Sequence, residues 1–182
     1  MTARPTPPIP HPTLAAGAPG ARRIAAIDIG SNSVRAIIAD VTAQGEIRVV
    51  DEMKAAPRLS AGLDQTGQLA ESTMQAALEA LQRMQALASQ LGATRIECVA
   101  TSATRDASNG TLFLERIRQA TGLRARIISG EEEARLSFRS AQAHFDLGSG
   151  RQVVCDIGGG SLELALSADG LVERLLSVPF GA

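Results

Sequence analysis

The stretch Ile24-Ala-Ala-Ile-Asp28-Ile-Gly30-Ser-Asn-Ser-Val-Arg35 decides the fold of this chain. An apolar run ends in an acid, a turn of small residues follows, and apolar alternation then resumes. This order is typical of a buried strand that delivers a carboxylate to its end, beside a turn whose backbone N–H groups can bind phosphate.

The same order recurs near the C-terminus, where residues 153–163 read Val-Val-Cys-Asp-Ile-Gly-Gly-Gly-Ser-Leu-Glu. The repeat aligns Asp28 with Asp156 and Arg35 with Glu163. A Gly-Gly-Gly run also fits an ordinary hairpin turn. However, three glycines lose much conformational entropy on folding, and an ordinary hairpin does not require them. Two copies in register therefore indicate a duplicated architecture built around phosphate. The expected phosphate-binding turn residues are Gly30, Ser31, Asn32 and Ser33 in the first copy, and Gly158, Gly159, Gly160 and Ser161 in the second.

The composition excludes several classes of protein. A net charge of -1 over 182 residues argues against binding to nucleic acid through phosphate neutralisation, and an aromatic content of 2% provides few stacking platforms. No apolar run reaches the roughly 20 residues that span a bilayer, and the N-terminus lacks the apolar core of a signal peptide. We therefore expect a cytoplasmic protein with no nucleic-acid or membrane partner. Cys98 and Cys155 both lie in apolar runs, which predicts small buried side chains without a disulfide or a metal.

The hydrophobic periodicity predicts an α/β protein. Residues 1–22 form a Pro-rich, disordered tail, residues 23–128 a first domain with a five-stranded mixed sheet, residues 129–150 a connecting helix and hinge, and residues 151–182 the start of a second domain. Strands are expected at 24–29, 34–41, 47–54, 95–100, 124–128, 152–156, 162–167 and 171–179, and helices at 70–91, 109–121 and 129–145. Residues 57–67 read as a loop, and Asn109 as a helix cap.

Acids and bases near the strand ends supply candidate chemistry. A glycine turn would fold Glu163 back beside Asp156, and Mg²⁺ favours a few carboxylates together with phosphate oxygens and water. Asp28, the acid of the first copy, is the third candidate metal ligand. Arg35 and Arg105 each follow a small polar loop, where a guanidinium can bind oxyanions bidentately instead of lying solvated. Thr101, Ser102 and Thr104 could donate hydrogen bonds at the same place, whereas His144 reads as a helix-surface residue.

Three consecutive acids, Glu131, Glu132 and Glu133, open the helix that begins near Ser129. Acids at this position complement the helix macrodipole, which explains acids in general without requiring three of them. One of the three could instead hold and deprotonate an attacking water. The chemistry alone does not choose among them.

Four motifs in order resemble the exopolyphosphatase/guanosine pentaphosphate phosphohydrolase (Ppx/GppA phosphatase) family of the actin-like ATPase superfamily. They are Asp28-Ile-Gly-Ser-Asn-Ser, Thr101-Ser-Ala-Thr-Arg105, Ile128-Ser-Gly-Glu-Glu-Glu133-Ala-Arg-Leu and Asp156-Ile-Gly-Gly-Gly-Ser-Leu-Glu163. The resemblance covers the chain from about residue 23 onward. It implies ribonuclease-H-like domains with a cleft between them, and Mg²⁺-dependent release of terminal phosphate from inorganic polyphosphate or pppGpp. It also implies a homodimer at full length.

The resemblance assigns the catalytic base to Glu133, metal- and phosphate-site acids to Asp156 and Glu163, and a phosphate ligand to Arg105. The family's complete second domain has no counterpart here, so we expect a truncated form whose last strands expose an apolar face and an unpaired edge. Two alternatives stay open. One is an ATP-dependent kinase of the same superfamily, and the other is a non-catalytic module that binds polyphosphate or the alarmone.

Overall fold

The computed structural model describes residues 20–181, which form two compact units, residues 20–128 and residues 129–181. Each unit is described by itself. The predicted Pro-rich tail lies outside the described residues except for its last three positions. No helix in the described range is both long and apolar enough to span a membrane.

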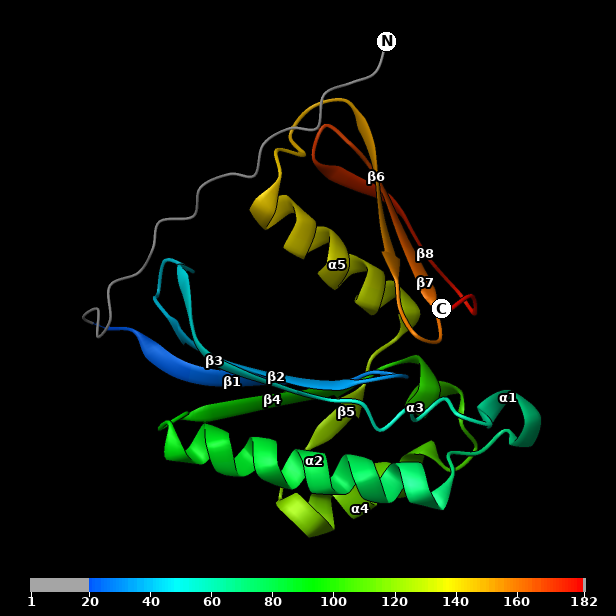
Figure 1. Cartoon of the computed structure of the whole chain (residues 1–182). Coiled ribbons are helices and arrows are strands. Elements are labelled where there is room, and N and C mark those ends of the chain that lie inside the picture. The colour runs from blue at the N-terminus through cyan, green and yellow to red at the C-terminus, as the bar shows by residue number, and fades with distance from the viewer. Residues whose placement is uncertain (1–19, 182) are drawn as a thin grey trace. The chain divides into compact units, whose positions relative to one another are not determined.

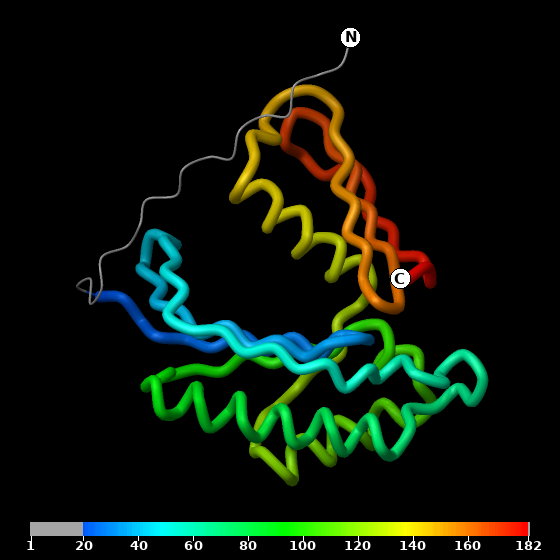
Figure 2. Tube along the Cα trace, in the orientation of Figure 1, coloured from blue at the N-terminus to red at the C-terminus, as the bar shows by residue number. Residues whose placement is uncertain are grey.

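The first unit is built on a mixed sheet with the strand order β3-β2-β1-β4-β5. The five-stranded mixed sheet expected from the sequence is confirmed, because β1, β2 and β3 form an antiparallel meander and β4 and β5 follow in parallel on the other side of β1. Figure 2 shows the chain leaving the meander for a long helical passage before it returns to the sheet. The strands are β1 (Arg22–Ile29), β2 (Val34–Val41), β3 (Ile47–Ala55), β4 (Arg95–Ala100) and β5 (Ala125–Ile127).

Helices cover one face of this sheet, as Figure 1 shows for α2 and α4. The helices of the unit are α1 (Leu63–Thr66), α2 (Glu71–Gln90), α3 (Ser102–Asp106) and α4 (Gly110–Thr121). Alternate strand residues such as Ile27 and Val34 pack with Leu81 of α2 and Phe113 of α4 in one core. Since strand side chains alternate between faces, the residues between these core positions point away from the helices.

Two short helices and one cap differ from the expectation. Residues 57–67 contain α1, and the polar segment after β4 forms α3. Helices of four or five residues are too short to produce a hydrophobic period, so the sequence pattern could not reveal them. Asn109 does precede α4, but its side chain does not cap that helix. Its amide instead pairs with the backbone of Leu69, accepting from the N–H at 2.8 Å and donating to the carbonyl at 2.9 Å.

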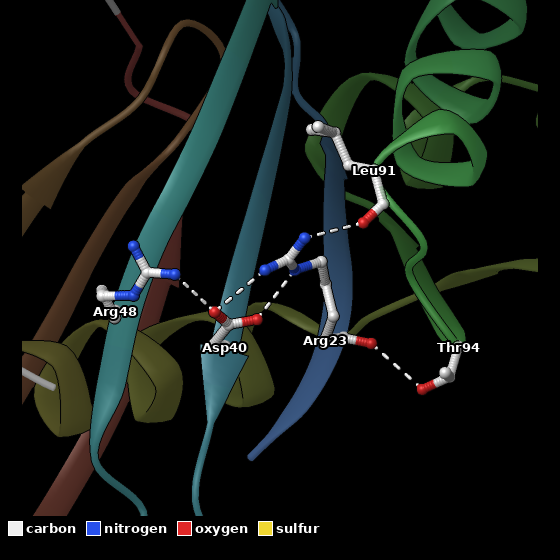
Figure 3. Close-up of polar contacts among 5 residues, drawn as sticks. All are labelled: Arg23, Asp40, Arg48, Leu91 and Thr94. Atoms are coloured by element: carbon white, nitrogen blue, oxygen red, sulfur yellow. Dashed lines mark hydrogen bonds and ion pairs between the residues drawn. The ribbon is translucent and has the colours of Figure 1, made fainter. Parts of the chain in front are cut away.

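A charged cluster joins three strands to the end of α2 (Figure 3). Asp40 accepts hydrogen bonds from Arg23 Nε at 2.8 Å and from Arg48 Nη2 at 2.6 Å. Arg23 Nη1 also donates to the carbonyl of Leu91 at 2.9 Å, and the Arg23 carbonyl accepts from Thr94 Oγ1 at 3.1 Å. Hydrogen bonds from Arg23 and then Arg48 lower the pKa of Asp40 to about 2.

The second unit is a three-stranded antiparallel sheet, order β6-β7-β8, with one helix along it (Figure 1). Its elements are α5 (Gly130–His144), β6 (Arg151–Ile157), β7 (Leu162–Ala168) and β8 (Leu171–Val178). Ser129 caps α5, since its Oγ accepts from the Glu132 N–H at 3.1 Å. Ala134 and Phe138 of α5 are buried, and the helix packs against all three strands.

The two cysteines differ in environment. Cys98 on β4 is buried, as expected, and burial, followed by the negative charge of Asp28, raises its pKa to about 12. The prediction was wrong for Cys155, which is exposed. Cys155 lies on the edge strand β6 and alternates with residues that face α5, so it points to the side of the sheet that α5 does not cover.

Candidate functional site

The two glycine turns, one in each unit, share the same backbone hydrogen bond. The Gly30 N–H donates to the Ser33 carbonyl at 3.0 Å, and the Gly158 N–H donates to the Ser161 carbonyl at 2.8 Å. The strand pairing beside each turn is also the same, with Asp28 opposite Arg35 and Asp156 opposite Glu163. The duplication read from the sequence therefore extends to hydrogen bonds and register.

The tightness of the first turn explains its glycine. A Cβ on Gly30 would lie 2.9 Å from the Ser33 carbonyl oxygen, closer than Cβ atoms tolerate. The Ser31 hydroxyl is buried and engaged inside the fold, 2.7 Å from Ser102 Oγ and accepting from the Ala103 N–H at 3.2 Å. The Ser31 hydroxyl thus fastens the turn to α3.

A loop of residues 57–61 is hydrogen-bonded to the same turn. The Arg58 N–H donates to the Asn32 carbonyl at 3.2 Å, and the Ser60 N–H donates to the Ser31 carbonyl at 3.0 Å. Ser60 Oγ also donates to Asn32 Oδ1 at 3.2 Å. The first turn is therefore held on both sides, by α3 and by this loop.

The Thr-rich segment predicted to contribute to the site lies directly beside the turn. The Thr101 N–H donates to the Ile29 carbonyl at 3.1 Å. Thr104 is fully buried, and its Oγ1 has no hydrogen-bond partner in the described residues. Arg105 Nη1 donates to the Ile128 carbonyl at 3.1 Å, which anchors the guanidinium at the end of β5. The structure thus brings the first turn and the segment that carries Arg105 together in one unit.

The two acids of the second unit lie side by side in a row across its sheet. Asp156, Glu163 and Ser177 are directly opposite one another on β6, β7 and β8. Glu163 is only 2% exposed and accepts from Ser177 Oγ at 2.9 Å. Asp156 is exposed and accepts from Ser137 Oγ of α5 at 2.5 Å. The sequence expectation that the turn folds Glu163 beside Asp156 agrees with this register.

Helix α5 crosses this row at two fixed contacts. Its first residue, Gly130, packs on Ser177, and a Cβ there would collide with the Ser177 side chain. Seven residues later, Ser137 reaches Asp156. Glu133 lies between these two positions on the same stripe, because residues three and four apart share one face of a helix. The helix start therefore carries Glu133 toward the strand of Glu163.

The carboxylate and hydroxyl oxygens in this row are suitable ligands for a hard cation. Mg²⁺ is usually held by one or two carboxylates and completes its coordination with substrate phosphates and waters. Asp156 and Glu163 supply two adjacent carboxylates, and the neighbouring donors are serine hydroxyls. Among the described residues, no three His, Cys, Asp or Glu side chains form a group that could hold a metal by themselves. Asp28, the third predicted ligand, belongs to the first unit.

Three residues that contact or face the predicted site residues were not predicted from the sequence. Ser137 and Ser177 orient the two acids, and Lys54 lies opposite Arg35 in the first sheet. Only the strand register identifies Ser177 and Lys54, because their neighbours come from other strands. Ser137 could have been found from its spacing, since it lies four residues after Glu133 on a helix.

The comparisons with known proteins agree on one family. Residues 37–182 match the Ppx/GppA phosphatase family. Exopolyphosphatase 1 of Mycobacterium tuberculosis is 32% identical over 160 residues, which are 88% of this chain and 46% of that protein. A guanosine-5'-triphosphate,3'-diphosphate pyrophosphatase of Vibrio vulnificus is 36% identical over 157 residues, 86% of this chain and 31% of that protein. The chain thus spans half or less of the length of these relatives.

Solved structures give the same result at the level of the fold. The Ppx/GppA family member of Aquifex aeolicus superposes with a TM-score of 0.77 at 32% identity, covering 88% of this chain and 52% of that one. An exopolyphosphatase of Cytophaga hutchinsonii superposes with a TM-score of 0.83 at 27% identity, covering 88% and 51%.

Proposed function

This chain belongs to the Ppx/GppA phosphatase family, and from that membership we propose that it hydrolyses terminal phosphoanhydride bonds of inorganic polyphosphate or pppGpp. Membership confirms the resemblance carried by the four motifs and the ribonuclease-H-like, actin-like ATPase fold with its mixed five-stranded sheet. The observation that carries the proposal is the duplicated turn, which presents the same Gly-to-Ser hydrogen bond and a preceding acid in both units.

The proposed mechanism assigns water activation to Glu133. The position of Glu133 on the α5 stripe, between the contacts to Ser177 and to Asp156, supports this role. In this role the Glu133 carboxylate would accept a proton from the attacking water and hold that water in line with the phosphorus. Backbone N–H groups of the turns at 30–33 and 158–161 are proposed to bind phosphate oxygens, and Arg35 and Arg105 to offset the negative charge that develops on them.

Asp156 and Glu163 are the proposed ligands of Mg²⁺ in the second unit, and Asp28 is the corresponding candidate acid of the first unit. The bound ion would screen the charge of the phosphates and polarise their oxygens. Ser137 and Ser177 keep the two carboxylates oriented by donating to them. We further propose a cytoplasmic location, which is supported by the free thiols of both cysteines. We also propose that the full-length protein forms a homodimer, as the resemblance to the family implies.

Phosphate release from polyphosphate, pppGpp and ATP, with and without Mg²⁺, tests the proposal. We expect Glu133→Ala to lower the rate by about 10²–10⁴, the usual contribution of a general base, while polyphosphate still binds. Glu131→Gln is the matched control at the same helix start and should keep its activity. Full turnover by Glu133→Ala would refute the assignment of the base. Binding without any release by the unaltered protein would favour the non-catalytic module, and transfer from ATP to an acceptor would favour the kinase.

A further inference from the structure

The helices α2 and α4 cover one face of the first sheet (Figure 1), and a row of charged residues crosses its other face. Asp28 of β1 is directly opposite Arg35 of β2, and Arg35 is directly opposite Lys54 of β3. All three residues are exposed. Directly paired residues point to the same side of a sheet, so these three side chains form one row beside the first glycine turn.

The pairing of Arg35 with Lys54 is unfavourable for the fold alone. Like charges directly opposite on neighbouring strands repel each other, with Cα atoms about 4.5–5.5 Å apart. Asp28 brings one negative charge to a row with two positive charges, and Glu52 is displaced by two residues along β3, opposite Ile37. Lys54 forms no ion pair with any described residue. An anion between the two cations would remove the repulsion.

Arg58 adds an independent anomaly at the same end of the sheet. Its φ of 55° lies in the left-handed region, which disfavours an arginine by about 1–2 kcal/mol. The other non-glycine residue of this kind in the described chain, Asp169, sits in an Asp-Gly hairpin turn where that conformation is usual. Arg58 does not lie in a hairpin turn: its N–H donates to the Asn32 carbonyl of the first glycine turn, and its carbonyl accepts from the Ala61 N–H. Strain of this kind is typical of ligand-binding positions.

We propose that Lys54, together with Arg35 and Arg58, binds the phosphate groups that lie beyond the one released from the substrate. The ligand class is a run of at least three phosphates joined by anhydride bonds, whether from inorganic polyphosphate or from a nucleoside triphosphate. This inference rests on the proposed function and adds to it a site for the remainder of the chain of phosphates. Lys54 contributes a compact charge, and the two arginines contribute planar donors.

Lys54 is the only lysine in the sequence, which permits a direct test on the unaltered protein. An amine-acetylating reagent modifies only Lys54 and the N-terminal amine, and peptide mass spectrometry separates the two sites. Inorganic tripolyphosphate should slow acetylation of Lys54 several-fold, with the N-terminal amine as the internal reference. Orthophosphate at equal ionic strength should leave the Lys54 rate nearly unchanged, and GTP in place of tripolyphosphate distinguishes the nucleotide source from the inorganic one.

Calorimetric affinity provides the second measurement. Lys54→Gln should weaken tripolyphosphate binding about tenfold, the value of one charge-assisted contact, and Lys54→Arg should retain most of the affinity. Arg83→Gln is the matched control, because it removes one charge from α2, on the other side of the sheet, and should leave the affinity unchanged.

The two proposals fail differently. If tripolyphosphate does not slow acetylation of Lys54 and Lys54→Gln binds it with unchanged affinity, the added phosphate site is overturned. This holds even if the protein releases phosphate. Protection of Lys54 and loss of affinity, without any release of phosphate, would support the site and overturn the hydrolytic function.

Discussion

Asp40 is a single carboxylate on which two arginines of neighbouring strands converge (Figure 3). Replacing it with Asn removes the charge, so Arg23 and Arg48 lose their shared acceptor in a nearly buried site. Breaking hydrogen bonds to charged groups in such a site should lower the free energy of unfolding by about 1–3 kcal/mol. Thermal unfolding monitored by circular dichroism measures the loss.

The pH dependence of this loss has a defined sign. The folded-state pKa of Asp40, about 2, is below the ordinary value of 3.8, so its stabilisation is complete above about pH 4 and disappears as the pH falls through 2. The difference between the unaltered protein and Asp40→Asn should therefore shrink over that window. Glu97→Gln is the control, since it breaks an exposed ion pair with Arg95 and should change stability little. Equal losses for both variants would contradict a special role for Asp40.

At the scale of elements, the start of α5 depends on the absence of a side chain at Gly130. Alanine favours a helix over glycine by about 1 kcal/mol, so propensity alone predicts that Gly130→Ala stabilises the protein. The packing predicts the opposite, because the new Cβ would collide with Ser177, whose hydroxyl binds Glu163. We expect a lower melting temperature and a lower rate of phosphate release from this variant.

A second-site change separates these two effects. Ser177→Gly removes the side chain that the new Cβ would meet, so the double variant Gly130→Ala/Ser177→Gly should recover stability relative to the sum of the two single changes. The coupling is read from thermal unfolding of all four proteins. Additive losses would mean that Gly130 and Ser177 do not pack against each other in solution.

The sequence predicted the longer elements of both units because their side chains follow one period. An apolar run in residues 24–29 and alternation in residues 34–41 indicated β1 and β2, and the Asp-Ile-Gly repeat predicted the pairing of Asp156 with Glu163. Contacts between distant segments could not be read in this way. Asn109 pairs with Leu69, forty residues earlier, and Cys155 is exposed because nothing among the described residues covers its side of β6.

At the scale of the whole chain, the candidate chemistry is divided between the two units. The first supplies the turn at 30–33, the segment with Arg105 and the basic row, and the second supplies the carboxylates Asp156 and Glu163. Sequence alone predicted most of these residues, because the duplication and the four motifs mark them. It did not predict Lys54, since the position of Lys54 follows from a strand pairing that no motif encodes.

The second unit leaves one face of its sheet open, and the two cysteines can test this. Val153 is 58% exposed and Ile157 68% exposed, and Cys155 lies between them on β6. We expect Cys155 to react with a thiol reagent at pH 8 at the rate of a free thiol, whereas Cys98, which is 3% exposed, should react only after unfolding. Cys98→Ser and Cys155→Ser assign each rate to its residue. Equal, slow rates at both sites would mean that this face is covered in solution.

Because the folded pKa of Cys98, about 12, exceeds its ordinary 9.0, the folded protein should also lose stability as the pH rises above 9, and Cys98→Ser should lack this loss.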